Sequence, residues 1–182
     1  MEWTRGDYRI STDKSFLSVE KIHALLLRSY WASRRPRETI RRSIEGSLCY
    51  GLYFRDEQIG FARVVTDHAT FYWLCDVFIE EDHRGQGLGR WLVRCVVETP
   101  ELAKLLGVLA TRDALGLYAP YGFSPPEAAG TLLWRRPGRQ PDETDPGGDQ
   151  DDKRHRQPLH GGNAVRPLPR DGPEEGTPAA PA

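Results

Sequence analysis

Three glycines at alternate positions, Gly85, Gly87 and Gly89, form a turn that could bind an anion. An apolar, strand-like run precedes this turn, and an amphipathic stretch with Arg90 and Trp91 follows it. Glycines leave a turn without bulky side chains, so its backbone N–H groups can approach a ligand closely. The N-terminus of the following helix would add partial positive charge. The stretch therefore predicts a binding site for a diphosphate group.

The spacing of these glycines argues against two common diphosphate sites. A dinucleotide-binding G-x-G-x-x-G sequence would need a third glycine where Arg90 stands, and the chain contains no G-x-x-x-x-G-K-[ST] sequence. Neither NAD nor a P-loop nucleotide is favoured as the ligand.

A second motif follows further along the chain. Residues 84–89 read Arg-Gly-Gln-Gly-Leu-Gly, and residues 117–123 read Leu-Tyr-Ala-Pro-Tyr-Gly-Phe. Either segment alone could be an ordinary basic turn or a pair of packing tyrosines. Together and in this order they resemble the R/Q-x-x-G-x-G/A and L-Y-x-x-x-G-F motifs of the GCN5-related N-acetyltransferases (GNAT). The chain is most similar to small, single-domain bacterial-type members, and the resemblance implies acetyl-CoA as cosubstrate.

The resemblance also implies a fold. It is the α/β (α+β) acyl-CoA N-acyltransferase fold, with a mixed central sheet, helices on both faces, and a cofactor cleft where the fourth and fifth strands of the family splay apart. The period of apolar residues along this chain would by itself indicate only α/β or α+β.

Most cofactor contacts in the family come from backbone amides. Val77 is the position whose amide would polarise the acetyl carbonyl, and Ile79 is the position whose amide would bind pantetheine. Thr111 replaces an asparagine that often contacts the cofactor. The positions that the resemblance assigns to the cofactor beyond these two amides are Arg84, Gly85, Gln86, Gly87, Leu88, Gly89, Arg90 and Thr111.

Transfer in the family is direct: a neutral amine attacks the thioester, and a tyrosine protonates the departing thiolate. Tyr118 matches that tyrosine, and a phenol suits this role because it stays protonated near neutral pH. A structural tyrosine is the alternative. Pro120 replaces a residue that is commonly a charged helix former, so it would end the helix early. Tyr121 is interpreted as a packing residue.

The general base is left open. Some family members carry a glutamate where this chain has Trp73. Asp76 is a candidate because a carboxylate in an apolar strand needs partners or water, although its side chain should point away from those of Val77 and Ile79. Asp67 and His68 are alternatives, each equally consistent with a turn residue. Water could also relay the proton.

The resemblance implies an acceptor site that is lined by the loop between the first two helices and by the later strands. Tyr30 and Trp31 could form an aromatic wall that attracts a cationic amine. Tyr30 could equally complete the apolar face of the first helix. Arg34 and Arg35 nearby would favour an acceptor with a carboxylate or phosphate and oppose a polycation.

These observations predict an acetyl-CoA-dependent N-acetyltransferase that acts on a primary amine of a small molecule, or less expectedly of a protein or peptide. The alternative is a fold member that binds acyl-CoA as a sensor or interaction module without turnover. The chain is expected to act as a monomer or homodimer.

Composition fits a small soluble enzyme. The chain has 182 residues, a formal net charge of −1, and no apolar run near the roughly 20 residues of a membrane span. We expect no nucleic-acid or membrane partner and no metal. The N-terminus lacks the apolar core of a secretory signal, and the three cysteines form no C-x-x-C pair. A cytoplasmic location with free thiols is expected.

Composition changes near residue 137. Residues 137–182 hold nine of the fourteen prolines and no Phe, Trp or Tyr. Such a segment cannot bury enough apolar surface to fold. We therefore predict an acetyltransferase domain over residues 1–136 and a disordered Pro/Gly/Asp-rich tail over residues 137–182.

Hydrophobic periodicity and turn residues predict the elements of the domain. Helices are expected at 18–30 with Ser18 as N-cap, at 36–44 before Gly46, at 87–98 and at 114–118. Strands are expected at 48–55, 58–66, 70–79, 107–111 and 131–135, and the first two of these form a hairpin through Asp56 and Glu57.

Overall fold

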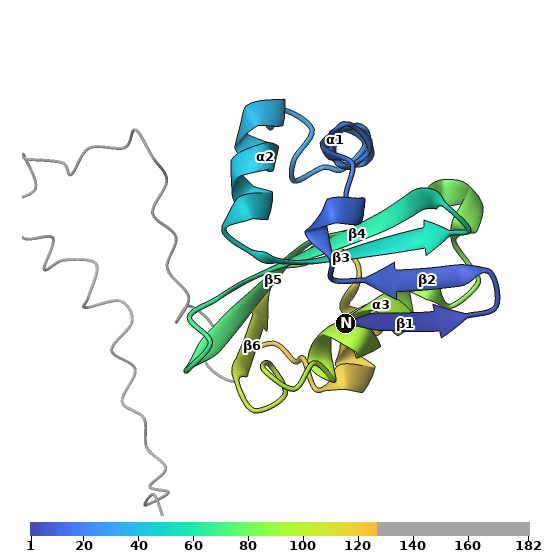
Figure 1. The fold of residues 1–182 in the computed structure, drawn as a ribbon. Coiled ribbons are helices and arrows are strands. Elements are labelled where there is room, and N and C mark those ends of the chain that lie inside the picture. Colours follow the sequence, from blue (N-terminus) through green and yellow to red (C-terminus); the bar gives the residue numbers. More distant parts are fainter. Residues whose placement is uncertain (127–182) are drawn as a thin grey trace, which may run out of the picture. The chain divides into compact units, whose positions relative to one another are not determined.

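The computed structural model describes residues 1–126. Its described part contains one six-stranded sheet in the order β1-β2-β3-β4-β5-β6 (Figure 1). Each neighbouring pair from β1 to β5 is antiparallel, and β6 is parallel to β5. The strands span Glu2–Arg5, Tyr8–Ser11, Leu48–Phe54, Glu57–Thr66, Phe71–Ile79 and Leu106–Leu109. The predicted mixed sheet is confirmed.

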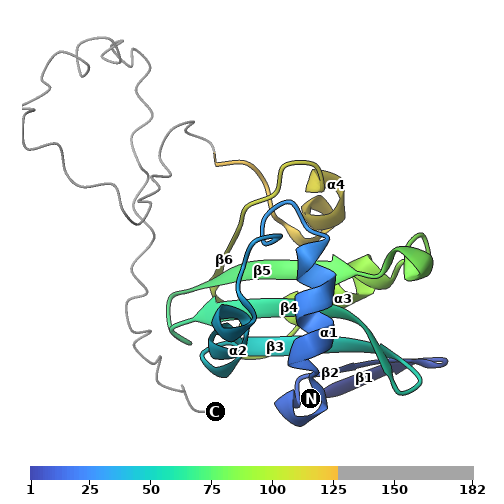
Figure 2. The same cartoon turned by 90° about the horizontal axis from the view of Figure 1, so that it is seen from above.

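Helices cover both faces of this sheet, as Figures 1 and 2 show. On one face lie α1 (Val19–Leu27) and α2 (Arg37–Glu45), and on the other lies α3 (Leu88–Val97). The short α4 (Leu115–Tyr118) follows β6 and lies beside α3. Three single-turn 3-10 helices complete the described elements: η1 (Lys14–Phe16), η2 (Glu81–His83) and η3 (Ala119–Tyr121).

Local sequence explains where the helices begin and end. The Ser18 hydroxyl accepts a hydrogen bond from the Lys21 N–H, which caps α1 as expected. Pro36 precedes α2, where its missing N–H costs nothing, and Gly46 ends that helix. The helix α1 ends at Leu27, with Arg28 as C-cap, and not at Tyr30. Tyr30 therefore does not complete the apolar face of α1.

Two apolar clusters fix the helices to the sheet. The larger joins α3 and α4 to the sheet through buried residues such as Tyr50, Leu92 and Val96. The smaller joins α1 and α2 to the opposite face, around Ile40 and Phe61. The two clusters hold helices on opposite faces of the sheet. The loops at the end of β5 are therefore fixed by packing from both faces.

The strand β5 carries a bulge near its end. Phe61 pairs with Phe78 and Arg63 pairs with Cys75, so β5 has one more residue than β4 between these pairs. Asp76 lies in this bulge with φ of 55°. The parallel pairing with β6 runs only from Phe71 to Leu74, so the second half of β5 has no partner in that strand. The end of β5 therefore has no β6 neighbour, which is what the expected splaying of these two strands requires.

Most expected elements lie within one or two residues of the observed ones. The turn between β3 and β4 is formed by Arg55 and Asp56, one residue earlier than predicted. The hairpin of β1 and β2 was not predicted. The strand expected at 131–135 and the tail predicted at 137–182 lie outside the described residues, so the domain boundary stays a prediction.

Two further expectations concern the described residues. The cysteines Cys49, Cys75 and Cys95 are free thiols. None of the helices in residues 1–126 combines the length and apolar character that a membrane crossing requires.

Candidate active site

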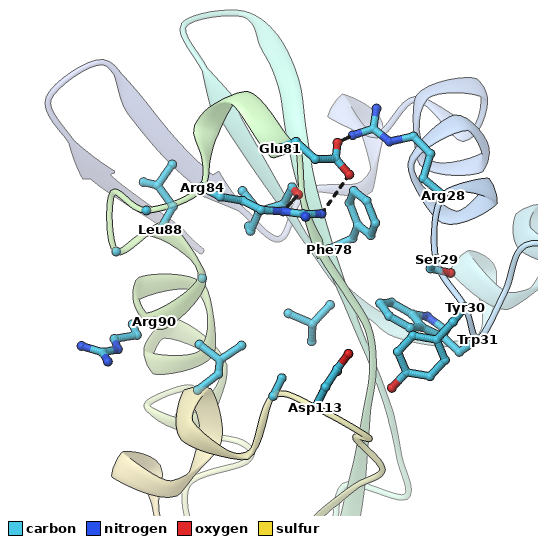
Figure 3. A pocket seen from close by; sticks show the side chains of 17 residues that line it. Arg28, Ser29, Tyr30, Trp31, Phe78, Glu81, Arg84, Leu88, Arg90 and Asp113 are labelled. Carbon is cyan, nitrogen blue, oxygen red and sulfur yellow. Dashed lines mark hydrogen bonds and ion pairs between the residues drawn. The ribbon is translucent and has the colours of Figure 1, made fainter.

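A cavity of about 770 Å³ opens at the end of β5, between α3 and the segment that follows α1 (Figure 3). This volume is in the range typical of small-molecule and cofactor sites. Its lining comes from four separate segments of the chain. The lining residues are Arg28, Ser29, Tyr30, Trp31, Val77, Phe78, Ile79, Glu81, Arg84, Gly85, Gly87, Leu88, Gly89, Arg90, Asp113, Ala114 and Leu117.

The glycine turn forms one wall of this cavity. Gly85 and Gly87 have φ of 77° and 76°, in the left-handed region that favours glycine. Gly87 is the N-cap of α3 and provides no capping side chain, and the first turn of α3 contains no acidic residue. In the described part of the chain, no N-cap side chain satisfies the first amides of this ten-residue helix at the edge of the cavity, which is an arrangement suited to an anion.

The two polar side chains at the start of the turn make contacts within the protein. The Gln86 Oε1 accepts a hydrogen bond from the Tyr8 hydroxyl at 2.8 Å, and its side chain does not line the cavity. The Arg84 Nε donates to the Ile79 carbonyl at 2.9 Å. These contacts attach the turn to β2 and to the end of β5, so they hold the turn in place.

A group of charged side chains surrounds Phe78 at the upper edge of the cavity (Figure 3). Glu81 forms ion pairs with both Arg28 and Arg84. The guanidinium carbons of Arg28 and Arg84 lie 5.4 Å and 5.1 Å from the Phe78 ring centroid. The acidic group and both basic groups on this edge are therefore already paired.

The end of β5 forms the floor. Val77 and Ile79 line the cavity and pack with the apolar cluster on the α3 side of the sheet. This half of β5 lacks a partner in β6. The two positions whose amides the resemblance assigns to the cosubstrate thus lie in the cavity beside the glycine turn.

Asp76 points away from the cavity. Its Oδ2 accepts hydrogen bonds from Arg35 Nη1 and Arg63 Nε, both at 2.8 Å, and the residue is only 4% exposed. Arg35 lies between α1 and α2, which places this carboxylate on the opposite face of the sheet from α3. A buried carboxylate bound by two guanidinium groups is poorly placed to accept a proton from an amine. Asp76 is better explained as a group that joins the α1–α2 loop to the bulge.

Replacing Asp76 by asparagine is expected to lower the free energy of unfolding by about 3 kcal/mol, because two partly buried guanidinium groups lose their counter-charge. Asparagine keeps the shape of the side chain and tolerates the positive φ of this position. Urea unfolding measures the change, and Asp56→Asn, in the exposed β3–β4 turn, provides the control. Unchanged stability would contradict a structural role for Asp76.

The alternative bases lie at the other end of β5. Asp67 accepts hydrogen bonds from Thr70 and from backbone N–H groups that follow it, and the Thr70 hydroxyl in particular holds the pKa of Asp67 well below its usual value. His68 lies 3.6 Å from Glu101. Six residues of extended chain, about 20 Å, separate Phe71 at the start of β5 from Val77. Neither side chain lines the cavity.

Tyr118 lies at the end of α4, against the cavity wall. It is 8% exposed and packs edge-on against Phe123, with ring centroids 6.1 Å apart. Burial raises the pKa of Tyr118 to about 12, with smaller contributions from Tyr30 and Asp113, which both line the cavity. The Tyr118 side chain is not itself part of the lining, but its neighbours Ala114 and Leu117 in sequence are.

The remaining motif residues position α4. Thr111 Oγ1 accepts the Ala114 N–H at 3.0 Å and does not line the cavity. The Tyr121 hydroxyl donates to the Arg90 carbonyl at 2.8 Å and so ties η3 to α3. Pro120 lies in η3, where the α-helix has already ended. The predicted early end of the helix is confirmed.

Tyr30 and Trp31 form the wall opposite the glycine turn (Figure 3). Their rings meet edge to face, with centroids 4.9 Å apart and planes at 84°. Both are partly exposed, Tyr30 at 47% and Trp31 at 42%. The expected aromatic wall is present, whereas Arg34 and Arg35 do not line the cavity.

Seven of the lining residues were not among the site residues predicted from the sequence: Arg28, Ser29, Phe78, Glu81, Asp113, Ala114 and Leu117. Asp113 stands five residues before Tyr118, in the segment between the second-motif helix and the preceding strand, and that proximity was the available signal. The sequence contained no such signal for Arg28 and Phe78, because their contact depends on how α1 crosses the end of β5.

Comparisons with known proteins agree with this geometry. Residues 45–125 match the family model described as an acetyltransferase (GNAT) domain. A candidate acetyltransferase of Gibberella zeae is 34% identical over 140 residues, which cover 64% of this chain and 78% of that protein. A GNAT-family crystal structure from Xanthomonas campestris pv. campestris has 42% identity and a TM-score of 0.68, covering 71% of this chain and 92% of that one.

A further solved structure, a GNAT-family acetyltransferase of Elizabethkingia anophelis with acetyl-CoA bound, has a TM-score of 0.52. At 20% identity over 66% of this chain and 78% of that chain, it shows the shared fold. The family match and the two more similar relatives favour an enzyme over a sensor without turnover. The chain belongs to the GNAT family of acetyltransferases.

Proposed function

We propose that the protein transfers an acetyl group from acetyl-CoA to a primary amine of a small molecule. The observation that carries this proposal is that the N-terminus of α3 and the half of β5 that has no partner in β6 lie in one cavity. One wall offers N–H groups for an anion, and the floor offers a strand edge next to it.

The lining of the cavity supports a CoA ester as the ligand. The first-turn amides of α3 and the amides of the glycine turn would hold the diphosphate, with Arg90 adding positive charge. The side chain of Arg84 is engaged with Ile79 and Glu81, so its main part is to fix the turn. Gln86 contributes through its backbone, since its side chain is bonded to Tyr8.

The end of β5 would hold the reactive end of the cosubstrate. The Ile79 amide is assigned to the pantetheine arm and the Val77 amide to the acetyl oxygen. A fixed N–H donor aimed at that oxygen stabilises the negative charge that develops there as the amine attacks. When bound, acetyl-CoA supplies an activated acyl group and a thiolate leaving group.

Tyr118 would donate a proton to the sulfur of the departing thiolate. Its raised pKa keeps the phenol protonated over the whole physiological range. A protonated donor beside the cavity can transfer its proton as charge builds on the leaving group. Asp76 is not retained as the base, and a proton from the amine can pass to water at the open side of the cavity.

The opposite wall makes a small molecule the favoured acceptor. The space left beside Val77 is bounded by Tyr30 and Trp31, so the acceptor approaches the floor through a walled cavity. A compact amine fits this enclosure better than a folded protein surface does.

Calorimetric titration of the full chain with acetyl-CoA tests the cosubstrate assignment. Saturable binding at one site per chain is expected, followed by release of CoA thiol when a panel of primary amines is added. A folded protein that binds neither acetyl-CoA nor CoA would contradict the proposal. Binding without thiol release from any primary amine would contradict the transfer step.

A further inference from the structure

The charges of the cavity are distributed unequally between its walls. Two carboxylates line it, those of Glu81 and Asp113. Glu81 is held by Arg28 and Arg84. Among the described residues, Asp113 has only a long ion-pair contact, 3.8 Å to Arg112 Nη2, and its side chain is 63% exposed. Within the cavity lining, Asp113 is thus the carboxylate available to a new cation.

Asp113 is directed at the acceptor side of the cavity. Figure 3 shows its carboxylate turned into the open space between the glycine wall and the pair of Tyr30 and Trp31. Asp113 and Tyr30 both line the cavity, and Asp113 directly precedes Ala114, the N-cap of α4, the helix that ends at Tyr118. An ammonium group bound by Asp113 would therefore lie on the α4 side of the cavity.

The aromatic pair provides the apolar part of this side. Trp31 lies between Tyr30, at 4.9 Å, and Phe78, at 6.4 Å between ring centroids. The guanidinium carbon of Arg112 lies 4.0 Å from the Tyr30 ring centroid, so this ring already holds a cation on one side. Large aromatic side chains left nearly half exposed in a cavity can bury the apolar body of a ligand.

Apart from Arg90 on the glycine wall, the basic side chains that line the described cavity are already paired, and Arg112, which lies over the Tyr30 ring, is not among the lining residues. Arg35 is bound to Asp76, and Arg28 is bound to Glu81. Arg34 does not line the cavity. Arg90 extends from α3, on the glycine wall, and points away from the open space in Figure 3. A carboxylate next to the acceptor amine would face Asp113 with no unpaired, cavity-lining guanidinium on the aromatic side to offset the repulsion.

We propose that the acceptor is a cationic primary amine on an apolar, aromatic body with no carboxylate beside the amine, and that Asp113 binds its ammonium group. The proposal rests on the proposed acetyl transfer and narrows its substrate class. It replaces the expectation of an anionic acceptor drawn from Arg34 and Arg35, because neither arginine lines the cavity.

The test compares two probes that differ by one carboxylate: 2-phenylethylamine and phenylalanine. Thiol release from acetyl-CoA is measured for the wild-type chain, Asp113→Asn and Asp56→Asn. The wild type is expected to prefer 2-phenylethylamine by at least about tenfold in kcat/KM, since an ion-paired hydrogen bond replaces a like-charge contact. The kcat/KM of Asp113→Asn toward 2-phenylethylamine is expected to be about tenfold lower than that of the wild type, mainly through a higher KM. The preference for 2-phenylethylamine over phenylalanine should narrow accordingly. Asp56→Asn removes the same charge from an exposed turn and should behave as wild type.

Calorimetry with acetyl-CoA on the same samples separates the possible failures. If acetyl-CoA binds but phenylalanine is used as well as 2-phenylethylamine, or neither is acetylated, the acceptor class is wrong while the cosubstrate assignment stands. If Asp113→Asn binds acetyl-CoA and retains the full preference, Asp113 does not select the acceptor. A folded wild type that does not bind acetyl-CoA would overturn the proposed function itself.

Discussion

Replacing Gly89 by glutamate is expected to weaken acetyl-CoA binding by at least about 100-fold. Gly89 is the second residue of α3 and lines the cavity. Two unit charges about 4 Å apart repel by roughly 4 kcal/mol at the effective dielectric of a protein surface, and 100-fold corresponds to about 2.7 kcal/mol. A carboxylate at this position would also occupy space beside the first amides of the helix.

Gly89 separates this effect from misfolding better than the neighbouring glycines do. A Cβ at Gly89 would meet Leu117 Cδ1 at 3.6 Å and Ile79 Cγ1 at 4.0 Å, which are ordinary contacts. Gly85 and Gly87 have positive φ, so any side chain there would strain the turn. An acidic residue in the first turn is compatible with helix stability, because it complements the helix dipole. The loss of binding should therefore occur in a folded protein.

Gly46→Glu is the matched control. Gly46 ends α2 with φ of −91°, and a Cβ there would meet no atom of the described residues within 4 Å. It introduces the same atoms and charge away from the cavity, so its titration with acetyl-CoA should match that of the wild type. If Gly89→Glu unfolds like the wild type and binds acetyl-CoA equally well, the diphosphate does not lie at the N-terminus of α3.

The parts of the site that depend on local sequence were predictable. The glycine turn needs conformations that glycine favours, and its position between a β-rich run and an amphipathic helix is visible in the order of residue types. Ser18 and Gly46 mark helix ends through their own backbone and side-chain preferences. Each of these features involves residues close together in the chain.

The parts of the site that depend on contacts between residues far apart in the chain were not predictable. The α1 helix stops at Leu27, before the apolar pattern does, and this frees Tyr30 and Trp31 to form a cavity wall. The bulge at Asp76 reflects pairing with β4, and its ion pairs join residues 41 and 13 positions apart. Asp113 becomes a cavity residue only because α4 lies beside α3. No local sequence pattern predicts such long-range contacts.

Removing the Tyr118 hydroxyl is expected to separate chemistry from binding. Tyr118→Phe should lower kcat by about 100-fold, within the range typical of a lost general acid, and leave the affinity for acetyl-CoA largely unchanged. The ring packs against Phe123 in the apolar cluster around α3, and phenylalanine preserves that packing. Calorimetry gives the affinity, and thiol release with the best amine gives kcat.

Tyr53→Phe is the control for this substitution. The Tyr53 hydroxyl is buried without a hydrogen-bond partner in the described structure, so its removal should cost little stability. Tyr53 lies in β3 and does not line the cavity. A Tyr118→Phe enzyme that keeps its full kcat would show that the thiolate is protonated by another group or by water.

The pH profile adds an independent check on Tyr118. Because burial raises its pKa to about 12, the acid form prevails below that pH and is lost only as the pH rises through it. The wild-type kcat should therefore show no decline from this group between pH 7 and about 10, where an ordinary tyrosine would begin to ionise. A fall in kcat with a midpoint near 10 that disappears in Tyr118→Phe would mean that the hydroxyl is far better solvated during turnover than its buried position implies. In that case the cavity would have to open around α4 when the cosubstrate binds.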